Sequence, residues 1–384
     1  MKILFIAEFF PTGKDLKFSG GVEARTFFVA RNLAKKHQVD VICTKQKGSK
    51  KFEKIGGISI HRVQPIIDYS ESAAVNEIPS KIRFILNAVR EGAFLKPDIV
   101  DGGNFIAHLI SKQISIKNKI PVVFWYPDVF IGQWFSTSGI ISGSAGWLLE
   151  KFNLLRGADH FIAISKSTLQ KLEKQKIQSR KMTLINCGVD PDEFKIKIDK
   201  NRKKTTICIS RLVSYKRIKD LVLAFALLLK KYPTLRLAIV GSGPEKTKLI
   251  GLGKNLKILN KIIFWENLPR IELIKRLKSS YLFCLPSAVE GFGITILEAA
   301  AAGIPFVVSN INVFKEITKN GKGGLLFELG SIYDLSKKIE TLLTDKNLYI
   351  KKVYEAKSLA KIYNWQDVAI KTEDVYKKLL NEKN

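Results

Sequence analysis

The amino-acid sequence predicts an α/β protein with two lobes, each a parallel β-sheet covered by helices on both faces. The chain has 384 residues, 46% of them hydrophobic, which exceeds what one ordinary hydrophobic core holds. Short apolar runs typical of buried strands alternate with helical stretches, and this series occurs twice. A lysine-rich segment, residues 195–204, separates the two series, so we place the boundary between the lobes near residue 200.

The elements follow in order along each series. The expected strands of the first lobe are KILFIA, VDVICT, PDIVDG, PVVFW and HFIAIS, with helices over residues 22–36, 82–95 and 167–176. Those of the second lobe are TTICIS, LRLAIV, KIIFW, YLFCLP, PFVVS and GGLLF. Apolar residues spaced three and four apart predict helix throughout residues 334–384. Because ligands of such sheets bind beyond the carboxyl ends of the strands, we expect the chemistry there, in a cleft between the lobes.

Net charge and residue spacing restrict the partners. The chain carries 64 Lys and Arg against 35 Asp and Glu, a net charge of +29, which favours anionic ligands or anionic membrane surfaces. The lysines are spread along the chain and no nucleic-acid-binding motif occurs, so nucleic acid is not an expected partner. The four cysteines and four histidines show no metal-ligand spacing, and no signal peptide is visible. We therefore expect a cytoplasmic protein without a bound metal.

The segment SAVEGFGITILEAAAAGIPFVVS, residues 287–309, carries Glu290 and Glu298 in otherwise apolar surroundings. It reads as a strand end, a glycine turn and a helix that ends at Gly303. Free backbone amides at the start of that helix form an anion site. The two carboxylates that flank this site carry negative charge, so they cannot be ligands of a phosphate. Carboxylates on either side of an anion site suit neutral hydroxyls, and a nucleoside-diphosphate sugar has that layout. The alternative is that both carboxylates are structural.

Several motifs in order along the chain resemble those of a known family. The E-x7-E pattern of EGFGITILEAAAAG is similar to the donor-site motif of retaining glycosyltransferases of family 4. FSGGVEART resembles the glycine-rich loop of that family, and FIAISKSTLQKL and INCGVDPDEF resemble the segments that close its first lobe. SRLVSYKRIKDLVLAFALL resembles its R-x4-K segment, and LAIVGSGPEKTKL its second glycine turn.

The resemblance implies a GT-B fold, with two Rossmann-like lobes facing a central cleft. It implies an acceptor-binding lobe over residues 1–198, a donor-binding lobe over residues 199–364, and a C-terminal helix, residues 365–384, that returns to the first lobe. It implies a retaining, metal-independent hexosyltransferase without a cofactor, whose donor is a nucleoside-diphosphate sugar. The implied catalytic residues are Glu290, Arg211 and Lys216; the implied donor-binding residues are Gly20, Gly21, Gly241, Gly243, Phe292, Gly293, Ile294, Thr295, Ile296 and Glu298.

Individual roles follow from the same resemblance. Glu290 would hold hydroxyls of the transferred sugar, Glu298 would bind the ribose, and Arg211 with Lys216 would neutralise the leaving diphosphate. Many members carry a histidine after the strand read here as PVVFW, whereas this chain has WYPDVFIGQW, with Tyr126 or Asp128 near that place. We expect this loop to contact the donor sugar or the acceptor. His108 reads as a helix-face residue instead, and the DPD at residues 190–192 lies in a loop and is not read as a metal site.

Alternative functions remain open at this point. A sugar-nucleotide epimerase would use the same fold, and a non-enzymatic anion-binding or membrane-binding protein would explain the charge but not the carboxylates. A dinucleotide-dependent oxidoreductase is disfavoured because GSGPEK lacks the third glycine of its fingerprint. The segment FIGQWFSTSGIISGSAGWLLEKFNLL is rich in aromatic and small apolar residues. We expect it, with nearby lysines, to contact an anionic membrane peripherally, on the inner face of the cell membrane, where the acceptor would be a glycan or a lipid-linked sugar.

Overall fold

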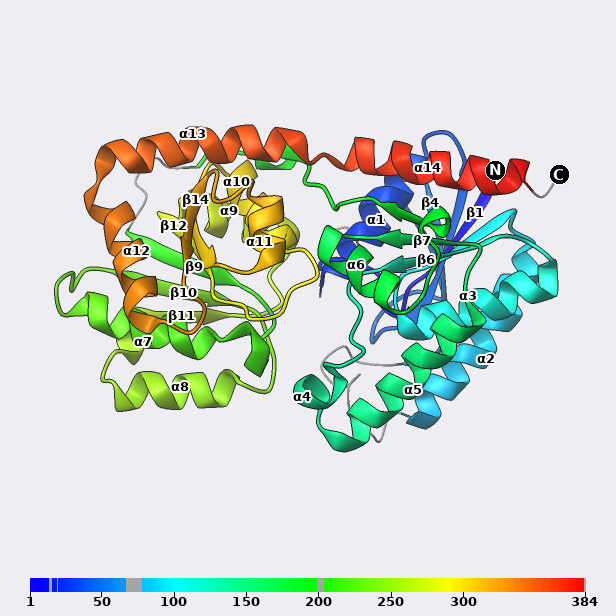
Figure 1. Cartoon of the computed structure of the whole chain (residues 1–384), viewed down its shortest axis with the longest axis horizontal. Helices are drawn as coiled ribbons and strands as arrows, with labels where there is room; N and C mark the ends of the chain where they lie inside the picture. The colour runs from blue at the N-terminus through cyan, green and yellow to red at the C-terminus, as the bar shows by residue number, and fades with distance from the viewer. Residues whose placement is uncertain (14–15, 19, 67–77, 199–203, 383–384) are drawn as a thin grey trace. The chain divides into compact units, whose positions relative to one another are not determined.

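The chain forms two compact units. The computed structural model describes residues 1–13, 16–18, 20–66, 78–198 and 204–382. Unit 1 comprises Met1–Cys187 together with Trp365–Asn384, and unit 2 comprises Gly188–Asn364 (Figure 1). Unit 2 therefore begins before the boundary at residue 198 that the lysine-rich segment predicts, and residues 199–203 of that segment lie outside the described residues. The C-terminal helix belongs to unit 1.

Unit 1 is built on an eight-stranded sheet with the order β3-β4-β2-β1-β5-β6-β7-β8. Its strands are β1 (Lys2–Ile6), β2 (Gln38–Lys45), β3 (Phe52–Ile55), β4 (Ile58–Ile66), β5 (Ile99–Gly102), β6 (Val122–Tyr126), β7 (His160–Ala163) and β8 (Met182–Leu184). All neighbouring strands pair in parallel except β3, which runs antiparallel to β4. The apolar runs predicted β1, β2, β5, β6 and β7, but β3, β4 and β8 were not expected.

The antiparallel edge of this sheet is a tight hairpin. Gly56 and Gly57 join β3 to β4 with φ values of +58° and +84°. Two successive residues with positive φ are typical of the two-residue turn that matches the twist of a hairpin, and glycine adopts them without steric cost. The GG pair between two short alternating runs was therefore an available signal for this hairpin.

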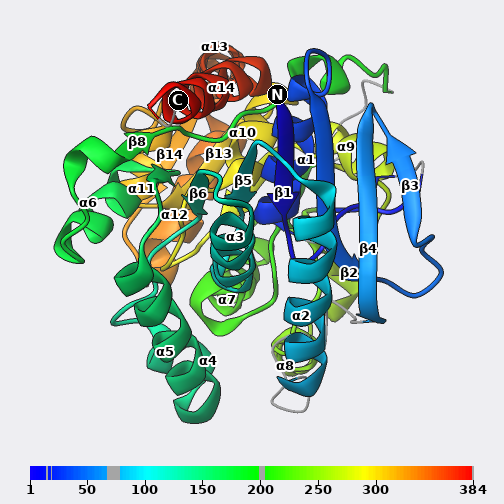
Figure 2. The same ribbon diagram turned by 90° about the vertical axis from the view of Figure 1, so that its right-hand side faces the viewer.

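Helices cover both faces of the unit 1 sheet, because successive strand residues point to opposite faces. Leu4 and Ile6 of β1 belong to a core cluster that α2, α3 and α5 complete. The helices of this unit are α1 (Gly21–Leu33), α2 (Ile78–Leu95), α3 (Phe105–Asn118), α4 (Trp134–Ser138), α5 (Ile140–Arg156), α6 (Lys166–Lys174) and α14 (Trp365–Asn381). Helix α3 packs against both α2 and α5 (Figure 2). Helix α14 packs against α1.

A buried polar cluster fixes α14 to the sheet of unit 1. Arg25 of α1 donates two hydrogen bonds to Asp101 of β5, at 2.9 and 3.1 Å. The hydroxyl of Tyr376 in α14 donates to the same carboxylate at 2.5 Å. Arg25 and Asp101 are almost fully buried, so each depends on the other for compensation of its charge.

His108 of α3 lies in the core and not at a strand end. It is fully buried, its ring stacks on Phe124 at 4.4 Å between centroids, and its Nε2 lies 3.0 Å from the carbonyl oxygen of Trp125. Burial lowers the pKa of His108 to about 3. The position agrees with a helix residue that faces the sheet and supports packing.

This burial makes a pH dependence of stability testable. The folded state cannot readily protonate His108, whereas an unfolded histidine binds a proton below its pKa of about 6.5. The unfolded state therefore gains protons that the folded state lacks as the pH falls from about 6.5 toward 3, and stability falls by about 1.4 kcal/mol per pH unit from this group. We expect His108→Gln to lose less stability than wild type over that range. Urea unfolding at several pH values measures the difference, and equal slopes would contradict the assignment.

Unit 2 is built on a six-stranded sheet in the order β11-β10-β9-β12-β13-β14, with every neighbouring pair parallel. Its strands are β9 (Thr205–Ile209), β10 (Arg236–Val240), β11 (Ile262–Trp265), β12 (Leu282–Leu285), β13 (Phe306–Ser309) and β14 (Gly324–Phe327). Each coincides with one of the apolar runs of the second series. The chain passes from β9 to β10 on one side and returns to β12 on the other, so the strand order reverses between β9 and β12.

The helices of unit 2 complete two layers around this sheet. They are α7 (Ile218–Leu229), α8 (Lys246–Asn255), α9 (Arg270–Ser279), α10 (Ile294–Ala301), α11 (Asn312–Ile317), α12 (Ile332–Thr344) and α13 (Lys346–Ile362). Helix α7 packs against α8 and α12, and α10 packs against α13. The tail expected to be helical throughout is interrupted, because Asp345 and the pair Tyr363 and Asn364 lie between helices.

Candidate active site

Two of the predicted residues meet where the strand order of unit 2 reverses. Lys216 ends a short 3-10 helix, η4 (Ser214–Lys216), that follows β9, and Glu290 lies in the loop that follows β12. The Nζ of Lys216 is 2.5 Å from Oε1 of Glu290, and the hydroxyl of Ser287 donates to the same oxygen at 3.1 Å. Parallel α/β sheets bind ligands beyond the carboxyl ends of strands at such a reversal. The basic partner of the glutamate thus comes from the neighbouring strand end.

The Lys216–Glu290 pair is shielded from solvent. The two side chains are 10% and 13% exposed. Burial lowers the pKa of Lys216 and the positive charge of Arg211 acts in the same direction, whereas Glu290 favours the charged ammonium. Each group therefore compensates the other in the absence of a ligand. An incoming anion that binds the ammonium would replace the carboxylate as its partner and leave Glu290 with acceptor capacity.

Arg211 lies on the same strand-end loop. It is exposed, its guanidinium donates to the hydroxyl of Tyr215 at 2.5 Å, and its Cζ lies 6.0 Å from the centroid of the Tyr215 ring. The carbonyl of Tyr215 accepts a hydrogen bond from the amide of Ala288 at 2.8 Å, which joins the loop after β9 to the loop after β12. Tyr215 was not predicted. It contacts both cations of the site, since the Nζ of Lys216 lies 5.3 Å from the centroid of its ring.

The glycines after β10 are required by backbone packing. Gly241 and Gly243 have φ values of +143° and +149°. A Cβ at Gly241 would lie 1.9 Å from the carbonyl oxygen of Ser210, and one at Gly243 would lie 2.4 Å from that of Leu212. Only glycine lets this turn approach the chain that leaves β9 toward Arg211. Contact of either glycine with a nucleotide stays a prediction.

The N-terminus of α10 lies directly after Glu290. Gly293 has φ +99° and is the N-cap of the helix, where it provides no side chain to cap the first helical amides. A Cβ at Gly293 would lie 2.9 Å from the Phe314 ring, so this position requires glycine for space as well as for φ. Phe292 is buried and packs edge-on to Tyr363. The predicted donor-binding residues in this loop and first turn are Phe292, Gly293, Ile294, Thr295 and Ile296, and their amides are the expected ligands for an anion.

Glu298 occupies a second polar cluster, which the sequence did not predict. It is largely buried and accepts a short hydrogen bond from Nη1 of Arg270, the first residue of α9. Nη2 and Nε of Arg270 donate to Oε2 of Glu193 at 2.8 and 3.2 Å. Burial raises the pKa of Glu193, and Arg270 opposes this shift. One signal was present in the sequence, since an arginine that begins a helix opposes the helix dipole and needs another reason to be there.

The predicted residues of unit 1 have local roles. Gly20 precedes α1 in an extended conformation and Gly21 is the first residue of α1. Tyr126 is fully buried at the end of β6, and burial raises its pKa well above the usual value. Asp128 is buried, pairs with Lys171 at 2.7 Å and accepts from the amide of Val129 at 2.8 Å. These contacts fix the loop after β6, and a role in binding a sugar stays a prediction.

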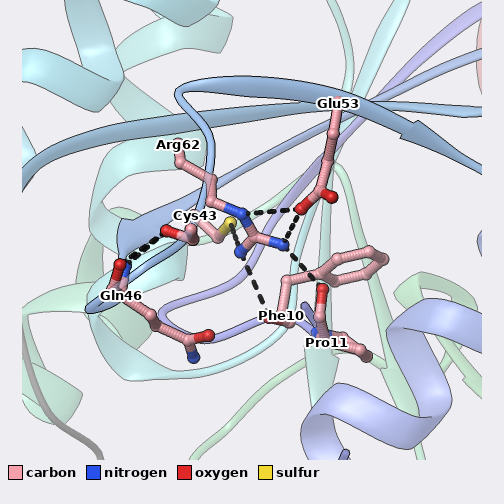
Figure 3. A network of polar contacts seen from close by, with 7 residues as sticks. Phe10, Pro11, Cys43, Gln46, Glu53 and Arg62 are labelled. Carbon is pink, nitrogen blue, oxygen red and sulfur yellow. Dashed lines mark hydrogen bonds and ion pairs between the residues drawn. The ribbon is translucent and has the colours of Figure 1, made fainter. Parts of the chain in front are cut away.

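Arg62 of β4 holds the chain that leaves β1 toward Gly20. Its guanidinium donates to the carbonyl oxygens of Phe10 at 3.2 Å and Pro11 at 2.6 Å (Figure 3). Glu53 of β3 accepts from the same guanidinium at 2.6 Å, so the unexpected hairpin carries both partners of this buried pair. The hairpin thereby supports the loop after β1.

No metal site emerges from the part of the chain that the structure describes, where no group of three or more His, Cys, Asp or Glu residues could hold an ion. Asp190 of the DPD segment caps η3 (Pro191–Phe194) by accepting from the amide of Asp192. Asp192 pairs with Lys195 at the surface. Within the same residues, no helix combines the length and the apolar character that crossing a bilayer requires.

Comparisons with known proteins identify the family and the fold of the chain. Residues 190–359 match the family model of glycosyl transferases group 1, and residues 19–193 match that of glycosyltransferase family 4. An uncharacterized glycosyltransferase of Haemophilus influenzae is 26% identical over 91% of this chain and 94% of that protein. The sucrose-phosphate synthase of Thermosynechococcus elongatus shares the fold with a TM-score of 0.85 and 17% identity over 100% of both chains. HepE of Anabaena, solved with UDP and glucose, has a TM-score of 0.78 and 18% identity over 99% of this chain and 100% of that one. The predicted α/β fold with two Rossmann-like sheets is confirmed.

Proposed function

Because this chain belongs to the group 1 glycosyltransferases of the GT-B fold, we propose that it moves a sugar from a nucleoside-diphosphate sugar to a hydroxyl acceptor with retention of anomeric configuration. The observation that supports this most directly is the Lys216–Glu290 pair, which lies where the strand order of unit 2 reverses. A cation lies there beside a carboxylate that can accept hydrogen bonds from hydroxyls, and both lie next to the N-terminus of α10. The diphosphate of a donor requires a cation and its sugar requires an acceptor for hydroxyls, and the two must be adjacent because diphosphate and sugar are bonded to each other.

In this proposal the donor diphosphate binds the amides at the start of α10 together with Arg211 and Lys216. Lys216 exchanges Glu290 for a phosphate oxygen, and the carboxylate released from the ammonium accepts hydrogen bonds from the transferred sugar. As the glycosidic bond breaks, negative charge grows on the leaving phosphate, where fixed donors stabilise it most. The acceptor oxygen bonds to the anomeric carbon from the face that the phosphate leaves, and a phosphate oxygen takes the acceptor proton.

A thermal-unfolding screen tests the donor assignment. HepE was solved in complex with UDP and glucose, which supports a uridine nucleotide as the first probe. We expect UDP, GDP or ADP, or one of their sugar conjugates, to raise the unfolding temperature, since a ligand at 100 times its Kd contributes about 2.7 kcal/mol. Stabilisation by a nucleoside diphosphate but not by its nucleoside would locate the diphosphate contacts. No stabilisation by any of these would overturn the proposed function.

Metal independence is a separate expectation. Arg211, Lys216 and the amides of α10 would already compensate the diphosphate charge, so a divalent cation has no required role there. Turnover should persist in excess EDTA at the rate measured without it. Loss of activity on chelation, with recovery on addition of manganese or magnesium, would count against this donor site.

The acceptor side of the proposal concerns unit 1. Helix α5 exposes Ile141, Leu148 and Leu155, which are 71%, 61% and 84% exposed and recur at seven-residue intervals. Helix α2 likewise exposes Leu86 and Phe94. Exposed basic residues accompany them on these helices and on α3, at Arg83, Arg90, Lys117 and Arg156. Apolar stripes with interspersed cations are typical of surfaces that bind anionic lipid.

We accordingly propose that α2 and α5 contact an anionic membrane, where a lipid-linked sugar or glycolipid would be the acceptor. The protein should bind vesicles containing phosphatidylglycerol in a sedimentation assay and bind neutral phosphatidylcholine vesicles much less, with binding that weakens as salt rises. Leu148→Ser with Leu155→Ser should reduce binding. Leu329→Ser, at an exposed leucine of unit 2, is the matched control. Absence of binding to the anionic vesicles would overturn this part.

A further inference from the structure

Arg270 has an arrangement that ordinary surface ion pairs lack. One edge of its guanidinium, formed by Nε and Nη2, is occupied by Glu193, and the remaining Nη1 is bonded to Glu298. The guanidinium carbon also lies 5.7 Å from the centroid of the Phe194 ring. Two different carboxylates and an aromatic face therefore fix the plane of this guanidinium. Its orientation in turn fixes the carboxylate of Glu298.

The charges of this cluster do not cancel. Glu193 and Glu298 share the single charge of Arg270, and all three side chains are at most 17% exposed. Burial and the facing carboxylate both raise the pKa of Glu193, and the guanidinium opposes this rise. A glutamate carboxylate has two oxygens that can accept hydrogen bonds. Nη1 of Arg270 engages Oε1 of this carboxylate.

The location of Glu298 gives its carboxylate a use. Glu298 lies in the buried face of α10, the helix whose first amides are the proposed diphosphate ligands. A carboxylate about one turn from a bound diphosphate is at a distance that suits hydroxyls of the adjoining ribose. A freely rotating carboxylate would lose rotamer entropy on binding, whereas one held by Arg270 has already lost it.

On the premise of the proposed function, we propose that Arg270 is a positioning residue for ribose recognition: by holding the Glu298 carboxylate in one orientation, it makes the donor site select nucleotides that carry both ribose hydroxyls. Arg270 does not contact the nucleotide in this proposal and acts through Glu298. Glu193 and Phe194 keep the guanidinium in place. Bonding two carboxylates in fixed directions needs the planar guanidinium of arginine, so a lysine, which offers a point charge, is not an equivalent residue.

The test compares two ligands on each variant. Calorimetric titration gives the Kd of UDP, or of GDP or ADP if that nucleotide stabilises the protein more, and the Kd of its 2′,3′-dideoxy form. We expect wild type to bind the complete nucleotide about tenfold or more tightly, the range of a hydrogen bond to a charged group. In Arg270→Lys and Arg270→Met this ratio should fall to about threefold or less, mainly through weaker binding of the complete nucleotide.

A purely structural role would give another pattern, because a partly unfolded site would weaken both ligands equally and leave their ratio unchanged. Arg276→Met is the matched control, since Arg276 lies on the same helix, pairs with Glu272 at the surface and should keep the wild-type ratio. A wild-type ratio in folded Arg270→Lys would overturn the proposal. So would a ratio near one in wild type, although nucleotide binding would then leave the proposed function intact. Absence of nucleotide binding in wild type would overturn both.

Discussion

Glu290→Gln is expected to reduce kcat by about 100-fold or more, the loss typical of removing one group that stabilises developing charge in a transition state. In the proposed reaction Glu290 contacts the sugar while its bond to phosphate breaks, so the contact strengthens between the bound substrate and the transition state. The free nucleoside diphosphate lacks the sugar. Its affinity should therefore stay near that of wild type, and steady-state rates beside calorimetric titration of the nucleoside diphosphate separate the two quantities.

The contact between Glu290 and Lys216 sharpens this expectation. Before the donor binds, the ammonium is occupied by the carboxylate at 2.5 Å. A neutral amide competes less strongly for Lys216, so nucleoside-diphosphate affinity should be unchanged or higher in Glu290→Gln, and not lower. Glu355→Gln is the matched control, because Glu355 pairs with Lys352 in a similarly half-buried position on α13. Turnover of Glu290→Gln at the wild-type rate would mean that this carboxylate is structural.

The fold was predictable from sequence where burial sets the pattern. Every strand of unit 2 coincides with an apolar run because strands buried on both faces need no polar alternation. The β3–β4 hairpin of unit 1 was missed because it forms the sheet edge, where Phe52 is half exposed and polar residues alternate. Its glycine pair was the only local sign of it.

The sequence pointed to individual residues of the candidate site but not to the contacts between them. Motif spacing selected Lys216 and Glu290 separately, whereas their pairing depends on β9 and β12 being neighbours in the sheet. Strand order is a tertiary property that periodicity does not encode. The Arg270 cluster was missed for the same reason, since Arg270 of α9 joins Glu193 of η3 to Glu298 of α10, and no motif connects these elements.

Lys216→Met carries the second large expected effect. Methionine preserves much of the length of the side chain but removes the charge that the proposed mechanism places on the leaving diphosphate. Nucleoside-diphosphate affinity should fall by about tenfold to 100-fold, which is the loss of one hydrogen bond between charged groups. The loss in kcat/KM should be larger than the loss in affinity, because charge on the phosphate increases as the bond breaks. Glu290→Gln should differ, because its kcat should fall while its affinity for the nucleoside diphosphate should not.

Stability supplies an independent readout of the same contact. Lys216→Met leaves Glu290, only 13% exposed, without its cation, at a cost of about 1–3 kcal/mol in the free energy of unfolding. Adding Glu290→Gln to this variant removes the uncompensated charge, so the double variant should recover stability while it stays inactive, and the two effects should be strongly non-additive. Lys352→Met serves as the matched control on rate, because its pair with Glu355 lies on α13. Additive losses of stability, or wild-type nucleotide affinity in Lys216→Met, would show that the two strand ends do not cooperate in binding a diphosphate.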